Sequence, residues 1–217
     1  MRREERITMN CGIVQINLNH CWGAHDILQQ FMKERKIEVA MITEPIHIPE
    51  RNWIGSMDKG AAICWNPGIR TRIIECFKGR EYVAIDAGKL VLISCYITPK
   101  ASLREFSEML RKLEDDMKLV DKEKDIILCG DFNAHNKRWG SRYTSCKGDR
   151  LLEWSEENNL IVVNEGNSPT CIRPQGVSWI DLTWATPTTA RRIRDWRVET
   201  EELSLSDHCY VTFSIGR

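Results

Sequence analysis

Apolar residues recur at two spacings along this chain, and the two spacings predict helices and strands in alternation. The clearest helix is predicted over about 102–121, where apolar residues recur every three or four positions behind a Ser102–Glu105 capping box. Two shorter amphipathic helices are predicted over about 24–36 and 149–158. Short runs rich in β-branched residues predict strands over 11–19, 38–43, 60–65, 70–76, 81–86, 90–96, 126–129, 160–163 and 209–215.

The order of these elements indicates the kind of sheet. The strand, helix and strand over 11–43 form the unit of a parallel sheet. The strands over 60–96 follow one another through short turns, which predicts an antiparallel meander. A further hairpin is predicted over 170–184, with its tip near Arg173–Gly176. Together these elements predict an α/β fold.

Length and composition are those of an ordinary globular protein. The chain has 217 residues, 42% apolar and 29% charged, which is enough for one large domain or two small ones. We expect an N-terminal extension over residues 1–10 and one domain over 11–217, because no linker interrupts the later elements. Lys and Arg number 31, as do Asp and Glu, so the overall charge does not indicate a strongly basic nucleic-acid binder. Any basic surface must be local.

The nine cysteines show no CxxC spacing, which speaks against a zinc framework. The sequence also has no secretory hydrophobic region and no apolar run of the ~20 residues that a membrane span needs. We therefore expect reduced, mostly buried thiols in an intracellular protein that does not enter a membrane.

Candidate chemistry begins at Gly130-Asp131-Phe132-Asn133, directly after a buried strand. Side chains two positions apart at a strand end point the same way. Asp131 and Asn133 would then bring an acceptor-only carboxylate and an amide donor to one spot, which suits a site that holds a water and an anionic oxygen. The alternative is an ordinary turn, since Asp and Asn are common turn residues.

Other polar residues also lie near predicted strand ends, where the sites of α/β sheets gather. Taken alone, each has a plain structural reading as a turn asparagine, a loop acid, a packed tyrosine or a core histidine. Asp181 has apolar neighbours, so its carboxylate needs a partner. Because Asp207 and His208 should point to opposite faces of a strand, His208 is expected to pair with a different carboxylate. The full candidate set is Asn17, Glu44, Tyr96, Asp131, Asn133, Asp181, Asp207 and His208.

This ordered set resembles the endonuclease/exonuclease/phosphatase superfamily, which includes deoxyribonuclease I and the abasic-site endonucleases. Within it the sequence is most similar to the endonuclease domains of site-specific non-LTR retrotransposons. The resemblance spans about residues 11–215 and rests on Gly130–His135, Trp139-Gly140-Ser141, Ser178–Thr183 and Ser206-Asp207-His208. It implies a four-layer α/β sandwich, in which two packed mixed β-sheets are flanked by helices. It also implies an N-terminal domain of a polyprotein that contains a reverse transcriptase.

The reaction that the resemblance implies is nicking of DNA at the element's target site, which leaves a 3′-OH that primes reverse transcription. The cofactor would be Mg²⁺, with Mn²⁺ as a substitute, and the place of action the nucleus. Glu44 and Asn17 would hold the metal. Asp131 would orient the attacking water, Asn133 and Tyr96 would donate to the phosphate, and Asp181 would orient His208 for phosphate contact or proton transfer. Asp207 would support the metal side or the His208 loop.

Double-stranded DNA would be held by local basic and polar surface. Arg173 at the hairpin tip is the first candidate for insertion into a groove, because arginine enters narrow minor grooves readily. Thr170 and Ser178 flank the hairpin and could hold the phosphate backbone. The remaining candidates are Arg138, Arg142, Arg191 and Arg192, although a charge cluster is more often a solvated face.

Two alternatives stay open at this point. The first keeps the chemistry and changes the substrate, as in an abasic-site repair nuclease or another phosphodiesterase or phosphatase of the same superfamily. The second is a catalytically inactive DNA-binding module. The complete candidate set speaks against the second, and both ribosomal DNA and telomeric repeats suit an element of this class as targets.

Overall fold

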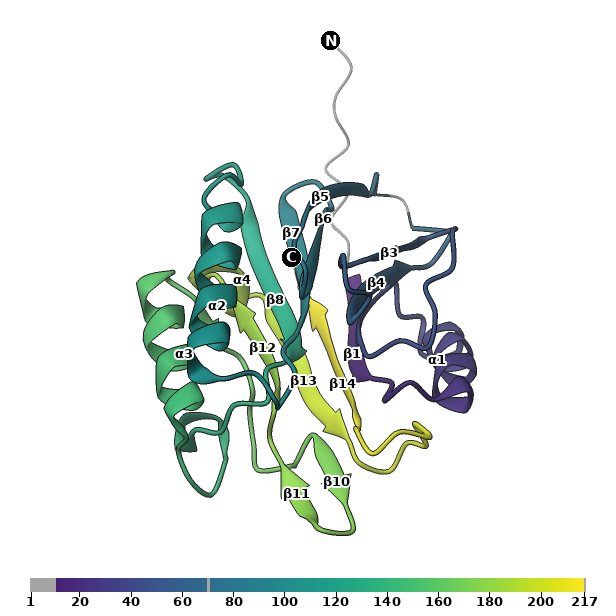
Figure 1. Ribbon diagram of the computed structural model, residues 1–217. Coiled ribbons are helices and arrows are strands. Elements are labelled where there is room, and N and C mark those ends of the chain that lie inside the picture. The colour runs from purple at the N-terminus through teal and green to yellow at the C-terminus, as the bar shows by residue number, and fades with distance from the viewer. Residues whose placement is uncertain (1–10, 70, 217) are drawn as a thin grey trace.

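Two six-stranded sheets pack face to face, and helices cover their outer surfaces (Figure 1). The computed structural model describes residues 11–69 and 71–216, so the extension expected over residues 1–10 lies outside the described residues. The two sheets together with the helices on each side form four layers. This arrangement confirms the expected α/β sandwich of two mixed sheets.

The first sheet is built around a parallel pair of strands. β1 and β2 run parallel, with Asn17 opposite Thr43, and α1 connects them; the other neighbours in the sheet are antiparallel. This connection is the parallel unit predicted from the sequence. In spatial order the strands are β13 (Ile193–Glu199), β14 (Tyr210–Ile215), β1 (Cys11–Asn17), β2 (Val39–Thr43), β4 (Ala61–Trp65) and β3 (Trp53–Gly55), and α1 is Trp22–Arg35.

The second sheet repeats this plan. β7 and β8 run parallel with Tyr96 opposite Asp131, and α2 connects them. In spatial order the strands are β5 (Ile74–Lys78), β6 (Tyr82–Asp86), β7 (Leu90–Tyr96), β8 (Asp125–Asp131), β12 (Asp181–Ala185) and β9 (Ile161–Val162). The remaining elements are α2 (Leu103–Met117), η1 (Lys137–Trp139), α3 (Cys146–Glu157), α4 (Pro187–Ala190) and the separate hairpin of β10 (Cys171–Arg173) and β11 (Gly176–Ser178).

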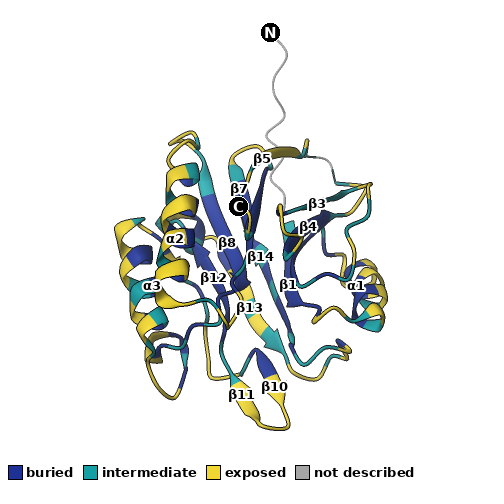
Figure 2. Ribbon diagram, in the orientation of Figure 1, coloured by how far each residue is buried: buried dark blue, intermediate teal, exposed yellow. Residues whose placement is uncertain are grey.

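Three apolar clusters separate the layers, and burial follows them closely (Figure 2). Ile13 and Leu92 belong to the cluster between the two sheets. Leu28 and Phe31 of α1 pack on the outer face of the first sheet, whereas Phe106 of α2 packs with α3 on the outer face of the second. Both faces of the central strands are therefore buried, which explains why most of these strands are continuous apolar runs.

Local signals in the sequence fix the two helices that cover the second sheet. Ser102 and Glu105 form the predicted capping box at the start of α2, a contact that contributes about 1 kcal/mol. Ser145 caps α3 by accepting a hydrogen bond from the amide of Gly148, so this helix begins three residues before its predicted start. A Cβ atom at Gly148 would lie 1.9 Å from the carbonyl oxygen of His135, and only glycine allows this contact.

Several sequence expectations need correction. The strands over 60–96 do not form one meander, because β4 joins the first sheet while β5, β6 and β7 form a meander in the second. Tertiary pairing decides this division, and turn signals do not report it. The strand expected over 70–76 is β5 at Ile74–Lys78, and the short edge strand β3 was not predicted.

All nine cysteines are free thiols, as expected, but four of them are buried, three are intermediate and two, Cys76 and Cys146, are exposed. The expectation that they are mostly buried was therefore only partly right. No helix within residues 11–69 and 71–216 is long and apolar enough to cross a bilayer.

Candidate active site

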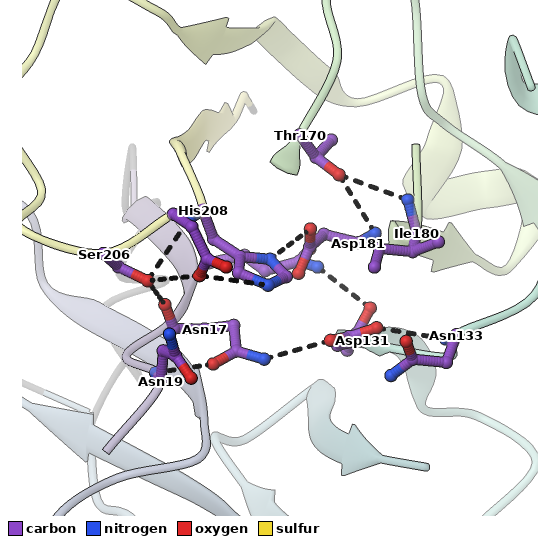
Figure 3. Close-up of polar contacts among 12 residues, drawn as sticks. Asn17, Asn19, Asp131, Asn133, Thr170, Ile180, Asp181, Ser206 and His208 are labelled. Carbon is purple, nitrogen blue, oxygen red and sulfur yellow. Dashed lines mark hydrogen bonds and ion pairs between the residues drawn. The ribbon is translucent and has the colours of Figure 1, made fainter. Parts of the chain in front are cut away.

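The candidate residues converge at one edge of the sandwich, where the parallel strands of both sheets end (Figure 3). β1 ends at Asn17 and β8 ends at Asp131, while β12 begins at Asp181 directly opposite Asp131. His208 lies just before β14, which is antiparallel to β1. Residues that are far apart in the chain are thus brought together by strand register.

Gly130 allows β8 to approach β7 closely just before this edge. A Cβ atom at this position would lie 1.9 Å from the carbonyl oxygen of Cys95. Gln15 of β1 joins the two sheets at this point. Its side-chain nitrogen donates to the carbonyl oxygen of Gly130 at 3.2 Å, and its side-chain oxygen accepts from the hydroxyl of Thr183 at 3.0 Å. Buried polar contacts therefore fix one sheet against the other directly behind the site.

Asn17 links two carboxylates. Its side-chain nitrogen donates to Glu44 at 2.8 Å and to Asp131 at 3.0 Å. Its side-chain oxygen accepts from the backbone amide of Asn19 at 2.7 Å. Tyr96 donates to the second carboxylate oxygen of Glu44 at 2.6 Å. Asn17 thus presents its nitrogen to the two acids and its oxygen to the backbone amide of Asn19.

Backbone conformation marks two of these residues. Glu44 and Asn133 both have a φ of 46°, in the left-handed region that residues other than glycine seldom adopt. Such strained positions cluster at functional sites, where surrounding contacts hold them in place. At Glu44, the amide donates to the carbonyl oxygen of Gly60 at 2.8 Å and Pro45 follows. The strain therefore fixes the direction in which this carboxylate leaves the end of β2.

Asn133 lies beside Asp131, but not for the reason that strand alternation suggested. β8 already ends at Asp131, and the backbone amide of Asn133 donates to the Asp131 carboxylate at 3.0 Å in a tight turn. The side-chain amide of Asn133 donates to the carbonyl oxygen of Ile97 at 3.0 Å. The turn reading is therefore correct, and the turn holds the carboxylate of Asp131 in place.

His208 and Asp181 form a buried pair. Nδ1 of His208 donates to Asp181 at 2.8 Å, and the two residues are 1% and 2% exposed. His208 therefore has a partner other than Asp207 for Nδ1, as the sequence predicted. Its Nε2 has no hydrogen-bond partner within the described part of the chain and lies 3.8 Å from Asp207. This nitrogen is the buried polar atom that faces the site.

Two neighbouring hydroxyl groups hold this pair. Thr170 is fully buried, and its hydroxyl oxygen accepts from the amides of Ile180 and Asp181 at 3.2 Å each. Ser206 donates to the carbonyl oxygen of Asn17 at 2.8 Å and accepts from the amide of His208 at 3.2 Å. The Thr170 hydroxyl is thus enclosed and positions Asp181, while a contact of Thr170 with the DNA backbone stays a prediction.

The pKa shifts follow from this burial and from the neighbouring charges. Burial raises the pKa of Asp131, with the nearby Asp181 as the second cause. For His208, burial lowers the pKa, but the charge of Asp181 and its hydrogen bond outweigh this, so the pKa is raised overall. Burial and the hydrogen bond to Glu44 raise the pKa of Tyr96. The raised pKa values favour a protonated imidazole at His208 and a neutral phenol at Tyr96.

The acids suit a magnesium ion. Mg²⁺ prefers oxygen ligands, often takes only one or two carboxylates and keeps several waters. The Glu44 side chain is 18% exposed at the rim, and Asn17 connects it to Asp131. Glu44 is therefore the residue that fits as a metal ligand, with Asp131 facing the same space. His20 lies 3.6 Å from Glu44 and was not predicted from the sequence.

The expected DNA-contacting residues are scattered. Arg138 and Arg142 are exposed around η1, and Ser178 is half-buried in the hairpin. Arg173 forms an ion pair with Asp207 and is thus not free at the tip. A surface cleft of about 460 Å³ adjoins Tyr96 and has both acidic and basic walls.

Arg191 and Arg192 do not belong to this site. Arg192 lies 3.7 Å from Asp125, the first residue of β8, whereas Asp131 is the last. Because each strand residue advances the chain by ~3.3 Å, Asp125 and Asp131 lie about 20 Å apart along β8. Strand register thus places Arg192 near the end of β8 opposite to Asp131, and contact of these two arginines with DNA stays a prediction.

Gln15 and Thr183 were also missed from the sequence. The only local signal was a polar side chain at an inward position of an apolar strand, as for Gln15 within Ile13–Ile16. Their role appears only once the two sheets are packed, since they contact one another across the interface.

Two mixed sheets within outer helices, and an Asn, Glu, Asp and His set at one edge, define the endonuclease/exonuclease/phosphatase superfamily. The model of the endonuclease-reverse transcriptase family matches residues 90–212, and the chain belongs to that family. Among solved structures, the endonuclease domain of TRAS1, a telomere-specific non-LTR retrotransposon, matches with a TM-score of 0.81 and 28% sequence identity. The match covers 94% of this chain and 98% of that one. No curated protein sequence matches. The predicted resemblance is thereby confirmed.

Proposed function

We propose that this domain is a divalent-metal-dependent endonuclease that nicks one strand of duplex DNA. The observation that carries the proposal is the convergence of Asp131, Asp181 and His208, whose side-chain atoms lie within 4.8 Å of one another, next to the Glu44–Asn17 pair. A phosphodiester needs a water to attack it, a proton donor near it and neutralisation of its charge. These residues can supply each of these in one buried corner.

Each side chain has a role that follows from its contacts. Asp131 is held by Asn17 and by the amide of Asn133, so its carboxylate can orient the attacking water. His208 is fixed through Nδ1 by Asp181 and presents Nε2–H to the phosphate. This is the orienting logic of a catalytic triad, without a protein nucleophile. Because the amide of Asn133 donates to Ile97, its main role is to hold the turn.

Glu44 is the proposed ligand for Mg²⁺, which Mn²⁺ can replace. A bound ion supplies charge neutralisation for the phosphate and the leaving 3′ oxygen. The chain's own contribution is orientation: Tyr96 and Asn17 each donate to Glu44 and set the direction of its two oxygens. The hydrogen bonds from Tyr96 and Asn17 hold the carboxylate of Glu44 in one orientation, and this orientation suits it to bind the ion.

DNA contact is assigned to the β10–β11 hairpin and to the loop around η1. Ile172 and Val177 face each other across the hairpin and are 45% and 38% exposed. Apolar side chains of this kind can wedge between base steps in the minor groove. Ser178, Arg138 and Arg142 supply polar and basic contacts, and Arg173 pairs with Asp207. Zero net charge fits a modest affinity for DNA.

Family membership also suggests the biological role of the nick. The nick would leave a 3′-OH that primes reverse transcription at the target site, in the nucleus, with a reverse transcriptase in the same polyprotein. The domain would span residues 11–217. This part of the proposal rests on the endonuclease-reverse transcriptase family and on the likeness to the TRAS1 domain.

The test is a comparison of two substrates with the purified chain. With Mg²⁺, supercoiled plasmid should become nicked circles whose ends carry 3′-OH groups, and EDTA should stop the reaction. A matched pair of short duplexes, one intact and one with a single abasic site, serves as the control. Cutting of the abasic duplex alone would identify a repair nuclease, and no cutting of any substrate would identify an inactive binding module.

A further inference from the structure

Three donor atoms of different chemistry meet on the hairpin side of His208. The sulfur of Cys171, a carboxylate oxygen of Asp207 and a ring nitrogen of His208 lie within 4.8 Å of one another. Cys171 has no role in the proposed reaction. We propose that these three residues form an inhibitory binding site for Zn²⁺, separate from the magnesium position at Glu44.

The backbone holds the three residues together independently of any ligand. Cys171 and His208 form an antiparallel bridge between β10 and the segment that leads into β14. The amide of Ile172 donates to the carbonyl oxygen of Asp207 at 2.7 Å, and the amide of Cys209 donates to that of Thr170 at 2.8 Å. Two segments that are distant in sequence are therefore fixed as a short strand pair, and their side chains cannot separate without breaking it.

The histidine is prepared for a metal in the manner of known zinc ligands. Its Nδ1 donates to the carboxylate of Asp181 at 2.8 Å, which fixes the ring and makes Nε2 the free donor. His208 is 1% exposed, and Nε2 has no hydrogen-bond partner among the residues described. A nine-tenths buried nitrogen without a partner is costly unless something binds it. It faces Cys171 and Asp207.

Asp207 supplies the oxygen ligand, and its partly exposed side chain is the side from which an ion would reach the cluster. One of its carboxylate oxygens pairs with Arg173, and the other lies 3.8 Å from Nε2 of His208. Its side chain is 23% exposed, whereas Cys171 is 1% exposed, so an ion would enter past the carboxylate. The ion pair with Arg173 holds this carboxylate beside the cluster.

The donor set selects zinc over magnesium. Zinc binds thiolate sulfur at ~2.3 Å and imidazole nitrogen at ~2.1 Å, and such donors lie roughly 3.5 Å apart around a tetrahedral ion. The Asp207 oxygen already lies 3.8 Å from Nε2 of His208, and no pair exceeds 4.8 Å, so rotation of the Cys171 and Asp207 side chains around the fixed imidazole could supply the remaining approach. Magnesium prefers oxygen donors and gains little from a thiol, so it stays with Glu44. Zinc binding would release the protons of the thiol and of Nε2.

Zinc at this cluster would stop the nuclease, and this consequence rests on the proposed function. The ion would occupy Nε2 of His208, which is the atom assigned to the phosphate. Excess Mg²⁺ would not relieve the inhibition, because the two ions use different residues. Binding itself does not depend on the assignment of activity.

The experiment uses Co²⁺ as a spectroscopic substitute for zinc. It compares wild type with Cys171→Ser, and the neighbouring Cys209→Ser is the matched control. Wild type and Cys209→Ser should show a thiolate-to-cobalt charge-transfer band that Zn²⁺ abolishes, and Cys171→Ser should lack it. Circular dichroism establishes folding, and Cys171→Ala replaces the serine variant if that does not fold. A band of equal strength in the Cys171 variant, or none in wild type, would overturn the site.

Plasmid nicking in excess Mg²⁺ then tests the consequence. The Zn²⁺ concentration that halves the rate should rise at least tenfold in Cys171→Ser and stay within twofold in Cys209→Ser. Equal inhibition of all three proteins would contradict inhibition through this cluster. If no protein nicks DNA, the proposed function fails, while the cobalt band still decides the zinc site.

Discussion

Asp181 accepts a hydrogen bond of 2.8 Å from Nδ1 of His208, and both side chains are almost completely buried. The hydroxyl of Thr170 holds the amide of Asp181, and the hydroxyl of Ser206 holds the amide of His208. The pair is therefore fixed at both ends, and Nε2 is the only ring nitrogen left to meet a substrate. The first prediction follows from this relationship.

Replacing Asp181 with Asn should lower the nicking rate by about 10²- to 10⁴-fold, because the charge that holds the imidazole protonated and oriented is lost. The pKa of His208 should fall as well, since the charge of Asp181 is what raises it against the effect of burial. NMR titration of the imidazole and single-turnover nicking measure the two effects. Asp115→Asn on the surface of α2 is the matched control, and a rate within twofold of wild type for Asp181→Asn would refute the orienting role.

Replacing Glu44 with Gln should raise the Mg²⁺ concentration that half-saturates nicking by more than about tenfold, because the one rim carboxylate that fits the ion loses its charge. Tyr96 and Asn17 would remain as donors, so the fold should be unaffected. A magnesium titration at fixed DNA concentration gives the shift. Glu108→Gln on α2 should leave the titration unchanged; an unchanged curve for Glu44→Gln would mean that the metal binds elsewhere.

The stability of the metal-free protein should depend on Asp131. Burial, and then the charge of Asp181, raise the pKa of this carboxyl to about 7. A folded-state pKa above the unfolded value means that stability is fully present below about pH 4 and is lost as the pH rises through about 7. Asp131→Asn should therefore be more stable than wild type by more than about 1 kcal/mol at pH 8. Near pH 4 the two should be equal.

Chemical denaturation in EDTA at both pH values measures this difference. The stabilised variant should also lose activity, because an amide does not hold the attacking water as the carboxylate of Asp131 does. A variant that is less stable than wild type at pH 8 would show that the carboxylate of Asp131 is not strained in the folded state.

The hairpin should decide where the enzyme cuts more than whether it cuts. Replacing the exposed cross-strand pair Ile172 and Val177 with Ser removes the proposed wedge and leaves the ion pair of Arg173 in place. The cleavage map on a long duplex carrying ribosomal DNA and telomeric repeats should change, while total nicking stays within about threefold. A full exchange of residues 172–177 should change the map further. Ile161→Ser on β9 is the control, and an unchanged map for the hairpin variants would exclude this role.

Much of the site could be predicted from the sequence, because the ends of apolar runs predict where the strands end. Asp131, Glu44 and His208 each follow or precede an apolar run, and parallel strands bring such ends to one edge. The capping box of Ser102 and Glu105 was equally readable, since both partners lie within one helical turn. These features depend on residues that are close together in the sequence.

Other features depend on contacts between distant segments, and no local pattern reports them. The burial of Thr170 and its hold on Asp181 require the hairpin to fold against β12. The placement of Arg192 beside Asp125 requires the register of the sheet, and Arg173 meets Asp207 only through the strand pair with His208. The direction of the Asn133 amide likewise depends on Ile97 of a neighbouring strand end.

One buried corner, formed by Asp131 and His208, is expected to carry out metal-dependent nicking. The most direct test is the nicking of supercoiled plasmid by wild type, Asp131→Ala and His208→Ala, with thermal melting to establish that all three are folded. Wild type should nick with Mg²⁺ and not with EDTA, and each variant should lose at least ~10³-fold in rate. Near-normal nicking by either folded variant would contradict the assignment.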